Sequence, residues 1–379
     1  MRRLIIILSV ACVFILGVFI FVKPAIVTLA RRQLANIFIQ SQVSVGECAF
    51  EPLRRISFFD IEIKRQGAYD IKVKEAAIQY NLFSIFKASP LKLSLKGSKV
   101  YLSTPKRQIR ELVSYLRLGR GAPIFRSVEV SDLILDLNTL DLTLKATLSS
   151  GVNLAEQSVD YLDSKIDTFK MFGVQLENFF LKLDSASGQG NFSIAQLKYD
   201  KLKVSDTKGK VRLEGKALSL YGVSARILNG DIGADMNLKI DKKAHYLVNL
   251  KCAGLDIETF VRDFNFQEKF NMTGRLSGDL KLKGRGEQIE ILQGSFSTLP
   301  PGGTLVIMDT KFLERMAHNT RQPLDLLVES FKNYPYNTGL MSLGFENGSV
   351  ILKIELEGEA GKRNLNVILH DFSVGKEGK

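Results

Sequence analysis

The sequence predicts a mainly β protein, with one long antiparallel sheet curled so that its apolar face lines an open groove. Period-two alternation of apolar and polar residues recurs along most of the 379 residues, whereas helical spacing appears in only a few short segments. No Pro/Ser-rich linker divides the alternating region, which favours one continuous sheet over separate modules. The alternative is an ordinary antiparallel sandwich that buries its leucine faces against each other.

An uncharged apolar run opens the chain. Leu4 to Val22 are 19 residues, long enough at about 1.5 Å per residue to cross a hydrocarbon core of roughly 30 Å. Signal-peptide cores are shorter, about 7 to 15 residues, and end at a small-residue cleavage site, whereas Lys23 and Pro24 follow here. Residues 4–22 therefore predict a transmembrane signal-anchor, with a cleaved signal peptide as the alternative. Residues 1–3 would be cytoplasmic and the following domain exported.

Residues 23–42 predict a helix that continues from this anchor. Apolar residues recur at helical spacing from Ile26 to Phe38, and Pro24 suits a first helical turn. We expect this helix to plug one end of the sheet.

Residues 43–372 predict the β-groove domain. In the stretch 272–296, Leu276, Leu280 and Leu282 occupy even-numbered positions, while the odd-numbered positions between them hold mostly charged residues. Alternate side chains of a strand point to opposite faces, so this pattern predicts one apolar and one solvent-exposed face. The candidate groove-lining residues are the apolar members of such segments: Leu91, Leu93, Leu95, Leu133, Leu135, Leu142, Leu144, Val211, Leu213, Leu276, Leu280, Leu282, Val350, Leu352, Ile354, Leu356, Leu365, Val367 and Leu369.

Turn residues and a few helices interrupt the alternation. Asn347-Gly348 is a strong two-residue hairpin signal. Helical spacing predicts helices at 107–119, at 255–264 and, as a pair whose second member starts at Pro323, at 309–334. Residues 373–379 predict a flexible, solvated tail.

The charge pattern favours a lipid surface over nucleic acid as a partner. The formal net charge is +12, but Lys and Arg are scattered singly over the polar faces, as at Lys92, Lys145 and Lys281, and Trp is absent. A nucleic-acid site would concentrate these charges in one patch with stacking aromatic residues. A diffuse positive surface is more typical of weak attraction to anionic lipids.

No pattern of residues indicates catalysis, a metal or a cofactor. His245, His318 and His370 are far apart and lack the spacing of metal ligands. Cys12 lies in the apolar run. Cys48 and Cys252 could pair in an oxidising compartment, although two separately buried thiols are the favoured interpretation. The protein is therefore not expected to be an enzyme.

Three stretches, at 56–103, 220–297 and 326–372, resemble the AsmA-like superfamily of Gram-negative envelope proteins, which includes the TamB and YdbH types. The first contains "AAIQYNLFSIFKASPLKLSLKGSKVYLS" after an opening strand. The second joins "LYGVSARILNGDIGADMNLKI" to "LDIETFVRDF" and "MTGRLSGDLKLKGRGEQIEILQGSF". The third has an aromatic-rich turn, a glycine hairpin and two long strands.

The resemblance implies a strongly twisted open sheet bent into a trough with an apolar interior. Phospholipid or other acyl lipid would lie along this AsmA-like β-groove and pass between the inner and outer membranes. The protein would be a single-pass inner-membrane protein with most of its chain in the periplasm. Lipid could pass on to an outer-membrane or periplasmic partner. Because each buried methylene contributes about 0.8 kcal/mol, bare acyl chains cross water only at a prohibitive free-energy cost.

A second function class remains open at this point. An AsmA-like envelope protein could instead be a non-transporting scaffold or assembly factor in outer-membrane biogenesis, and an extracytoplasmic adhesion domain is a third possibility. Lipid bound to the purified protein would favour the conduit, whereas a folded, lipid-free protein would favour the scaffold.

Overall fold

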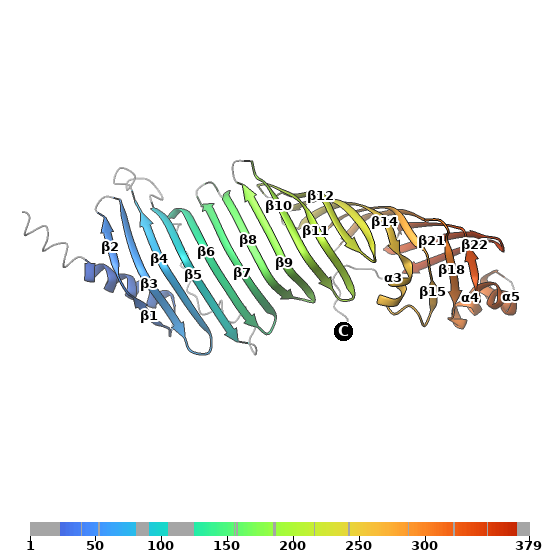
Figure 1. Cartoon of the computed structure of the whole chain (residues 1–379), viewed down its shortest axis with the longest axis horizontal. Helices are drawn as coiled ribbons and strands as arrows, with labels where there is room; N and C mark the ends of the chain where they lie inside the picture. Colours follow the sequence, from blue (N-terminus) through green and yellow to red (C-terminus); the bar gives the residue numbers. More distant parts are fainter. Residues whose placement is uncertain are drawn as a thin grey trace, which may run out of the picture. The chain divides into compact units, whose positions relative to one another are not determined.

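The computed structural model describes a chain built almost entirely of long strands (Figure 1). The described residues are 23–38, 40–51, 54–80, 91–104, 125–154, 156, 158–184, 187–215, 217–241, 243–286, 288–320, 323–346 and 348–369. They divide into two compact units, residues 1–187 (unit 1) and residues 188–379 (unit 2). The predicted anchor at 4–22 and the predicted tail at 373–379 lie outside the described residues. Within the described ranges, no helix is both long and apolar enough to cross a membrane.

Unit 1 contains a helix over residues 23–37 and nine strands. The strands are β1 (Gln42–Val45), β2 (Cys48–Glu51), β3 (Arg55–Arg65), β4 (Tyr69–Gln79), β5 (Leu91–Thr104), β6 (Phe125–Thr139), β7 (Leu142–Asn153), β8 (Ser158–Met171) and β9 (Val174–Asp184). Both β1 and β2 pair with β3, and each later strand pairs with the next one along the chain. The helix expected over residues 23–42 is shorter in the structure, where it ends at residue 37 and β1 begins at Gln42.

One strand pair corrects the expectation of a purely antiparallel sheet. β5 and β6 run parallel, with Leu93 opposite Val128 and Val100 opposite Leu135. A tight hairpin can join only antiparallel neighbours, whereas parallel neighbours need a connection of a dozen or more residues. The segment 105–124 between these strands is long enough for that return. The helix predicted at 107–119 lies in this segment, outside the described residues.

Unit 2 contains ten long or medium strands in one sheet, a small three-stranded sheet and three helices. The main-sheet strands are β10 (Gln189–Tyr199), β11 (Leu202–Glu214), β12 (Ala217–Ile227), β13 (Gly230–Ile240), β14 (Ala244–Asp256), β16 (Arg275–Arg285), β17 (Gln288–Thr298), β20 (Thr338–Glu346), β21 (Ser349–Gly358) and β22 (Gly361–Leu369). Neighbours in this order pair antiparallel. The small sheet joins β15 (Phe270–Met272), β18 (Gly303–Ile307) and β19 (Tyr334–Tyr336).

The helices and the hairpin predicted in unit 2 are confirmed. α3 (Ile257–Asp263) begins after Asp256, whose carboxylate caps the helix by accepting a hydrogen bond from the Glu258 amide. α4 (Thr310–Thr320) and α5 (Leu324–Phe331) form the predicted pair, and Pro323 precedes the second helix. β20 and β21 pair through Glu346 and Ser349 across residues 347–348.

The apolar face stays continuous although the sequence alternation changes parity within several strands. In β5, the apolar side chains are at odd positions up to Leu95 and at even positions from Val100 onward. Gly97, between them, has φ of +58°, and Asp60 in β3 and Asp132 in β6 also have positive φ. A left-handed residue turns the next side chain back to the same face, and such irregularities increase strand bending and twist.

Candidate functional site

Unit 1 carries an apolar face that crosses seven strands at matched register. Successive cross-strand partners from β3 to β9 are Ile63, Ile71, Val100, Leu135, Ala146, Ile166 and Phe179. Partners opposite each other in a sheet have Cβ atoms about 4.5–5.5 Å apart, so these side chains form one unbroken apolar row. We call this surface, with its parallel rows through Leu93 and Leu144, the apolar face of unit 1.

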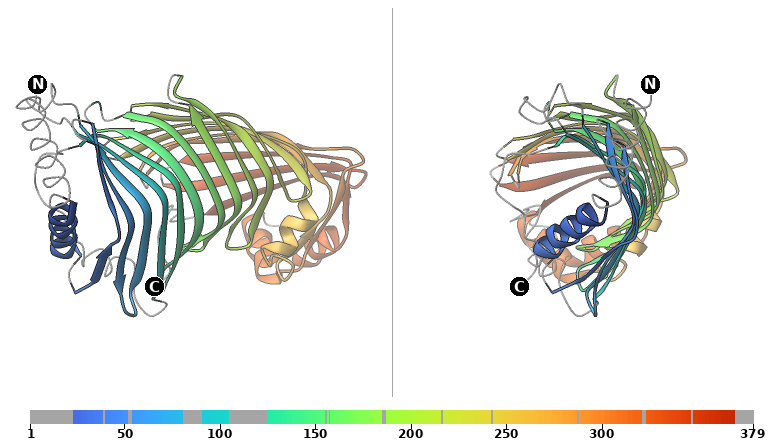
Figure 2. Two further views of the ribbon diagram at one scale, coloured as in Figure 1. Left: turned by 60° about the vertical axis from the view of Figure 1, so that its left-hand side comes forward. Right: turned by 90° about the vertical axis from the view of Figure 1, so that its left-hand side faces the viewer.

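The helix at 23–37 covers one end of this face. Ile26, Val27, Ala30, Leu34 and Phe38 pack against a buried cluster formed by β1, β3 and β4. Figure 2 shows the helix on the side toward which the strands of unit 1 curve, so the apolar face is the concave face. The ring of Phe38 lies 6.2 Å from the ring of Tyr69, measured between centroids, in an edge-on arrangement. The sequence expectation that this helix plugs one end of the sheet agrees with this packing.

Beyond β5, the apolar face of unit 1 has no covering layer among the described residues. Leu135, Leu144, Phe169, Phe179 and Leu181 are all half-buried and belong to neither of the buried clusters of the described chain. A sheet with one apolar face ordinarily buries it against a second layer of structure. These strands instead leave an extended aliphatic and aromatic surface partly open to solvent.

Unit 2 has an apolar face of the same kind. Successive partners from β11 to β17 are Val211, Leu220, Met236, Val248, Leu282 and Leu292. A neighbouring row passes through Ala234, Leu250 and Leu280. Most of these side chains are half-buried, and only Val211 and Leu292 at the two ends of the first row are buried.

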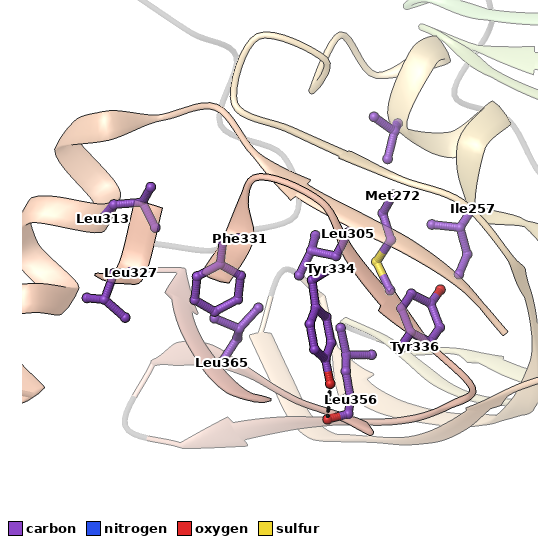
Figure 3. Packing of buried hydrophobic residues seen from close by; sticks show 11 residues of the cluster. Ile257, Met272, Leu305, Leu313, Leu327, Phe331, Tyr334, Tyr336, Leu356 and Leu365 are labelled. Atoms are coloured by element: carbon purple, nitrogen blue, oxygen red, sulfur yellow. Dashed lines mark hydrogen bonds between the residues drawn. The ribbon is translucent and has the colours of Figure 1, made fainter. Parts of the chain in front are cut away.

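A closed hydrophobic cluster covers the other part of the unit 2 sheet. Side chains from α3, α4, α5 and the three-stranded sheet pack onto β21 and β22 (Figure 3). Tyr334, Tyr336 and Leu356 are each only 1% exposed. The Tyr334 hydroxyl donates to the carbonyl oxygen of Leu356 at 3.3 Å and also contacts that of Gly361. This cap ties the small sheet to β21 and β22.

The predicted lining residues differ in how far the structure buries them. Most remain half-buried on the two apolar faces: Leu91, Leu93, Leu95, Leu133, Leu135, Leu144, Leu213, Leu280, Leu282 and Leu352. Leu142, Val211 and Val350 lie on the same faces but are buried. Leu276 and Ile354 pack against the closed cluster, while Leu356 and Leu365 lie inside it, so no open groove exists at these two positions. The side chains of Val367 and Leu369 lie outside the described residues.

Several residues of both apolar faces are absent from the predicted lining set. Phe169 in β8 pairs with Leu144, Leu220 in β12 with Val211, and Leu250 in β14 with Leu280, which are predicted lining residues. Phe179 in β9 extends the row that contains Leu135. In β9 and β12, positive-φ residues, Asn178 and Gly222, interrupt the alternation. Asn or Gly within an otherwise alternating run is the signal that could have identified these strands.

The opposite face of each sheet is polar and carries surface ion pairs. Lys92 contacts Glu129 at 3.0 Å, Lys72 contacts Glu62 at 3.1 Å, and Lys283 contacts Glu290 at 3.0 Å. The hydrogen bond from the Lys92 ammonium lowers the pKa of the Glu129 carboxyl, against the opposing effect of partial burial. Such exposed pairs add little to stability, and they keep this face hydrated.

The described residues provide no catalytic or metal-binding arrangement. No group of three or more His, Cys, Asp or Glu side chains in these ranges could hold a metal ion. His245 lies on β14 and His318 on α4, whereas His370 lies outside the described residues. Cys48 and Cys252 are free thiols, and burial raises the pKa of both, which lowers their reactivity.

A protein-family model matches a large part of the chain. The model of the YdbH-like family, described as "Intermembrane phospholipid transport protein YdbH", matches residues 126–338, which is more than half of the chain. The matched region runs from β6 to β20 and includes most of both apolar faces. No curated protein matches the chain.

Proposed function

Because the chain belongs to the YdbH-like family, we propose that it carries phospholipid along the apolar faces of its two units, as one component of transport between the inner and outer membranes. The observation that carries this proposal is the apolar row in each unit, much of which has no covering layer among the described residues. In unit 1 the uncovered part runs from Leu135 to Phe179, and in unit 2 the row runs from Val211 to Leu292, with only these two end residues buried.

An acyl chain is a suitable occupant of such a row. The side chains are aliphatic or aromatic and offer no polar group that would require a matched partner. Each methylene removed from water contributes about 0.8 kcal/mol to the binding free energy. A long acyl chain contacts several strands at once, so many of its methylenes contribute. Because adjacent strands present similar side chains, a bound chain can move along the face without losing a specific contact. The surface therefore suits transport better than tight storage.

The proposed location is the inner membrane, with most of the chain in the periplasm. Residues 4–22 would provide a single-pass anchor, and the helix at 23–37 would lie at its exit on the concave face of unit 1. The sequence supports this arrangement through its 19-residue uncharged run preceded by Arg2 and Arg3. Membrane lipids are then the immediate partners, and an outer-membrane or periplasmic protein would receive the cargo.

Lipid analysis of the full chain tests the proposal. The chain is expressed in cells with its anchor, purified, and exchanged into a lipid-free amphipol before the bound lipids are extracted and counted. We expect about one or more phospholipid molecules per chain. The double variant Leu135→Asn with Leu280→Asn, which places an amide on the uncovered face of each unit, should retain markedly less phospholipid than the wild type.

The main competing function is that of a scaffold for outer-membrane biogenesis. A folded chain that reproducibly carries no phospholipid after the same purification would contradict transport and favour the scaffold. Equal lipid retention in the wild type and the double variant would also contradict the proposal, because bound lipid would then lie elsewhere, for example around the anchor.

A further inference from the structure

A row of basic side chains lies at one edge of the unit 2 sheet. Lys239 in β13 pairs in register with His245 in β14, and His245 pairs in turn with Arg285 in β16. All three are exposed and alternate with Leu238, Tyr246 and Gly284 of the apolar face. We call these three residues the basic edge row. Lys239 and Arg285 are within one residue of the ends of their strands, so the row lies at the margin of the sheet.

Two further cations lie beside the basic edge row. The Lys243 side chain, in the β13–β14 turn, approaches Gly286, since its Cδ would be 3.7 Å from a Cβ added there. Lys283 lies two residues before Arg285 on the same face, but its ammonium contacts Glu290 at 3.0 Å. Within the described ranges, Lys239, Lys243, His245 and Arg285 make no ion pair, although Asp241 is present in the same turn.

An open pocket lies at Lys239 and His245 of the basic edge row. Lys283, Leu247 and further residues of β12, β13, β14 and β16 complete its lining. Lysine and histidine donors line this pocket, and Arg285 lies next to it as the cross-strand partner of His245. Such donors suit a phosphate oxygen better than a carbonyl, because a charge-assisted hydrogen bond is roughly twice as strong as a neutral one. The arrangement therefore indicates an anion site.

The apolar face lies directly behind this pocket. Leu238 and Tyr246 are cross-strand partners on that face, and both are half-buried. The Tyr246 ring leans over Gly284, because a Cβ added to Gly284 would lie 2.3 Å from the tyrosine hydroxyl oxygen. At the ends of the strands only one layer of backbone separates the two faces. A lipid whose acyl chains lie on Leu220 and Leu238 could therefore turn its phosphate over this edge.

We propose that the basic edge row binds the phosphate of a phospholipid carried on the apolar face of unit 2 and selects anionic headgroups over zwitterionic ones. This inference rests on the proposed function. A headgroup that adds an ammonium next to the phosphate would place a positive charge against Lys239 and Arg285, whereas an uncharged glycerol headgroup would not. The selection therefore acts through repulsion of the amine as well as attraction of the phosphate.

Competition between two phospholipids tests the inference. The full chain is loaded from vesicles containing equal amounts of phosphatidylglycerol and phosphatidylcholine, and the bound lipids are quantified. The wild type should be enriched in phosphatidylglycerol about five- to tenfold, on the scale expected for one or two charge-assisted contacts. Lys239→Ser with Arg285→Ser should bring the ratio close to that of the vesicles without reducing total bound lipid. Both side chains are exposed, so the variant should fold normally.

A matched control separates a specific site from general electrostatics. Lys208→Ser with Lys210→Ser removes the same charge from exposed mid-strand positions of β11 on the same polar face and should leave the enrichment unchanged. An unchanged ratio in the edge variant, or an equal fall in the control, overturns the inference. Binding of inorganic phosphate without lipid selection would also overturn the inference. In that case phosphate would raise the melting temperature of the wild type but not of the Lys239→Ser, Arg285→Ser variant, and the two proteins would bind the lipids in the same ratio. Absence of all bound lipid would instead contradict the proposed function itself.

Discussion

The hydroxyl of Tyr336 in β19 donates a hydrogen bond to the carbonyl oxygen of Thr273, which lies between β15 and β16 and 63 residues earlier in the chain. The ring fits against two glycines, because a Cβ added to Gly274 or Gly303 would lie 2.8 Å from the hydroxyl oxygen. This contact fastens the three-stranded sheet to the connection that leads into β16. The cap over β21 and β22 is thus held in place by a buried tyrosine as well as by apolar packing.

Replacing Tyr336 by phenylalanine should loosen this cap. The Thr273 carbonyl would lose its partner in a buried site, at a cost of about 1–3 kcal/mol. Hydrogen–deuterium exchange should show faster exchange in β15, β18 and β19, while β11 to β14 keep their wild-type rates. Tyr199→Phe is the control, since Tyr199 is 57% exposed and should change no exchange rate. Unaltered protection of β19 in the Tyr336 variant would contradict the structural role of this hydrogen bond.

Stability of the cap should also depend on pH in a defined direction. Burial raises the pKa of Tyr336 from about 10 to about 12, so the folded state holds this proton more tightly than the unfolded state. The resulting stabilisation, about 3 kcal/mol, is fully present below pH 10 and is lost as the pH rises through 12. The free energy of unfolding should therefore fall more steeply between these values in the wild type than in Tyr336→Phe. Parallel pH profiles for the two proteins would be inconsistent with a buried, protonated hydroxyl.

Truncation of Leu356 and of Leu280, both apolar residues of alternating strands, should change the free energy of unfolding by different amounts. Leu356 is 1% exposed inside the cap, so Leu356→Ala should destabilise unit 2 by about 2–5 kcal/mol. Leu280 is half-buried on the uncovered part of the face, and Leu280→Ala should cost about 1 kcal/mol because little transfer from water is lost and no cavity forms. Chemical denaturation, followed by exchange in β21 and β16, measures both changes. Similar losses for the two variants would indicate that the face at Leu280 is covered after all.

A glycine in the cap should tolerate no side chain. A Cβ at Gly303 would lie 2.1 Å from the Thr273 carbonyl oxygen, which is backbone and cannot move aside cheaply. We expect Gly303→Ala to displace β18 and destabilise the cap by about 1–3 kcal/mol, a range typical of overpacked sites. Gly344→Ala is the control because no atom lies within 4 Å of its added Cβ. Equal melting temperatures for the two variants would contradict the packing seen around Tyr336.

Alternation in the sequence was sufficient to predict strands and an apolar face, but not which part of that face is covered. Leu352 and Leu356 share one parity in β21, yet Leu356 lies under the cap and Leu352 does not. The difference depends on α4, α5 and β19, which reach these strands only through the tertiary fold. Local pattern carries no information about such coverage.

Two other features were not readable from alternation. The parallel pairing of β5 with β6 is one, because side-chain parity is the same for either strand direction. At Gly97 and Asp132 the apolar residues shift from odd to even positions or the reverse, so one long strand resembles two shorter strands in the sequence. A mid-strand Gly, Asp or Asn should therefore be considered as a left-handed residue before a strand is taken to end.

Site-specific photocrosslinking along one strand in each unit tests the central claim most directly. A crosslinking amino acid is placed at Leu144 and Leu280 on the apolar faces and, as matched controls, at their neighbours Lys145 and Lys281 on the polar faces. In cells, we predict lipid adducts at Leu144 and Leu280 and none above background at Lys145 and Lys281. Equal labelling of both parities, or no lipid adduct at either apolar position in a folded protein, would contradict lipid transport along these faces.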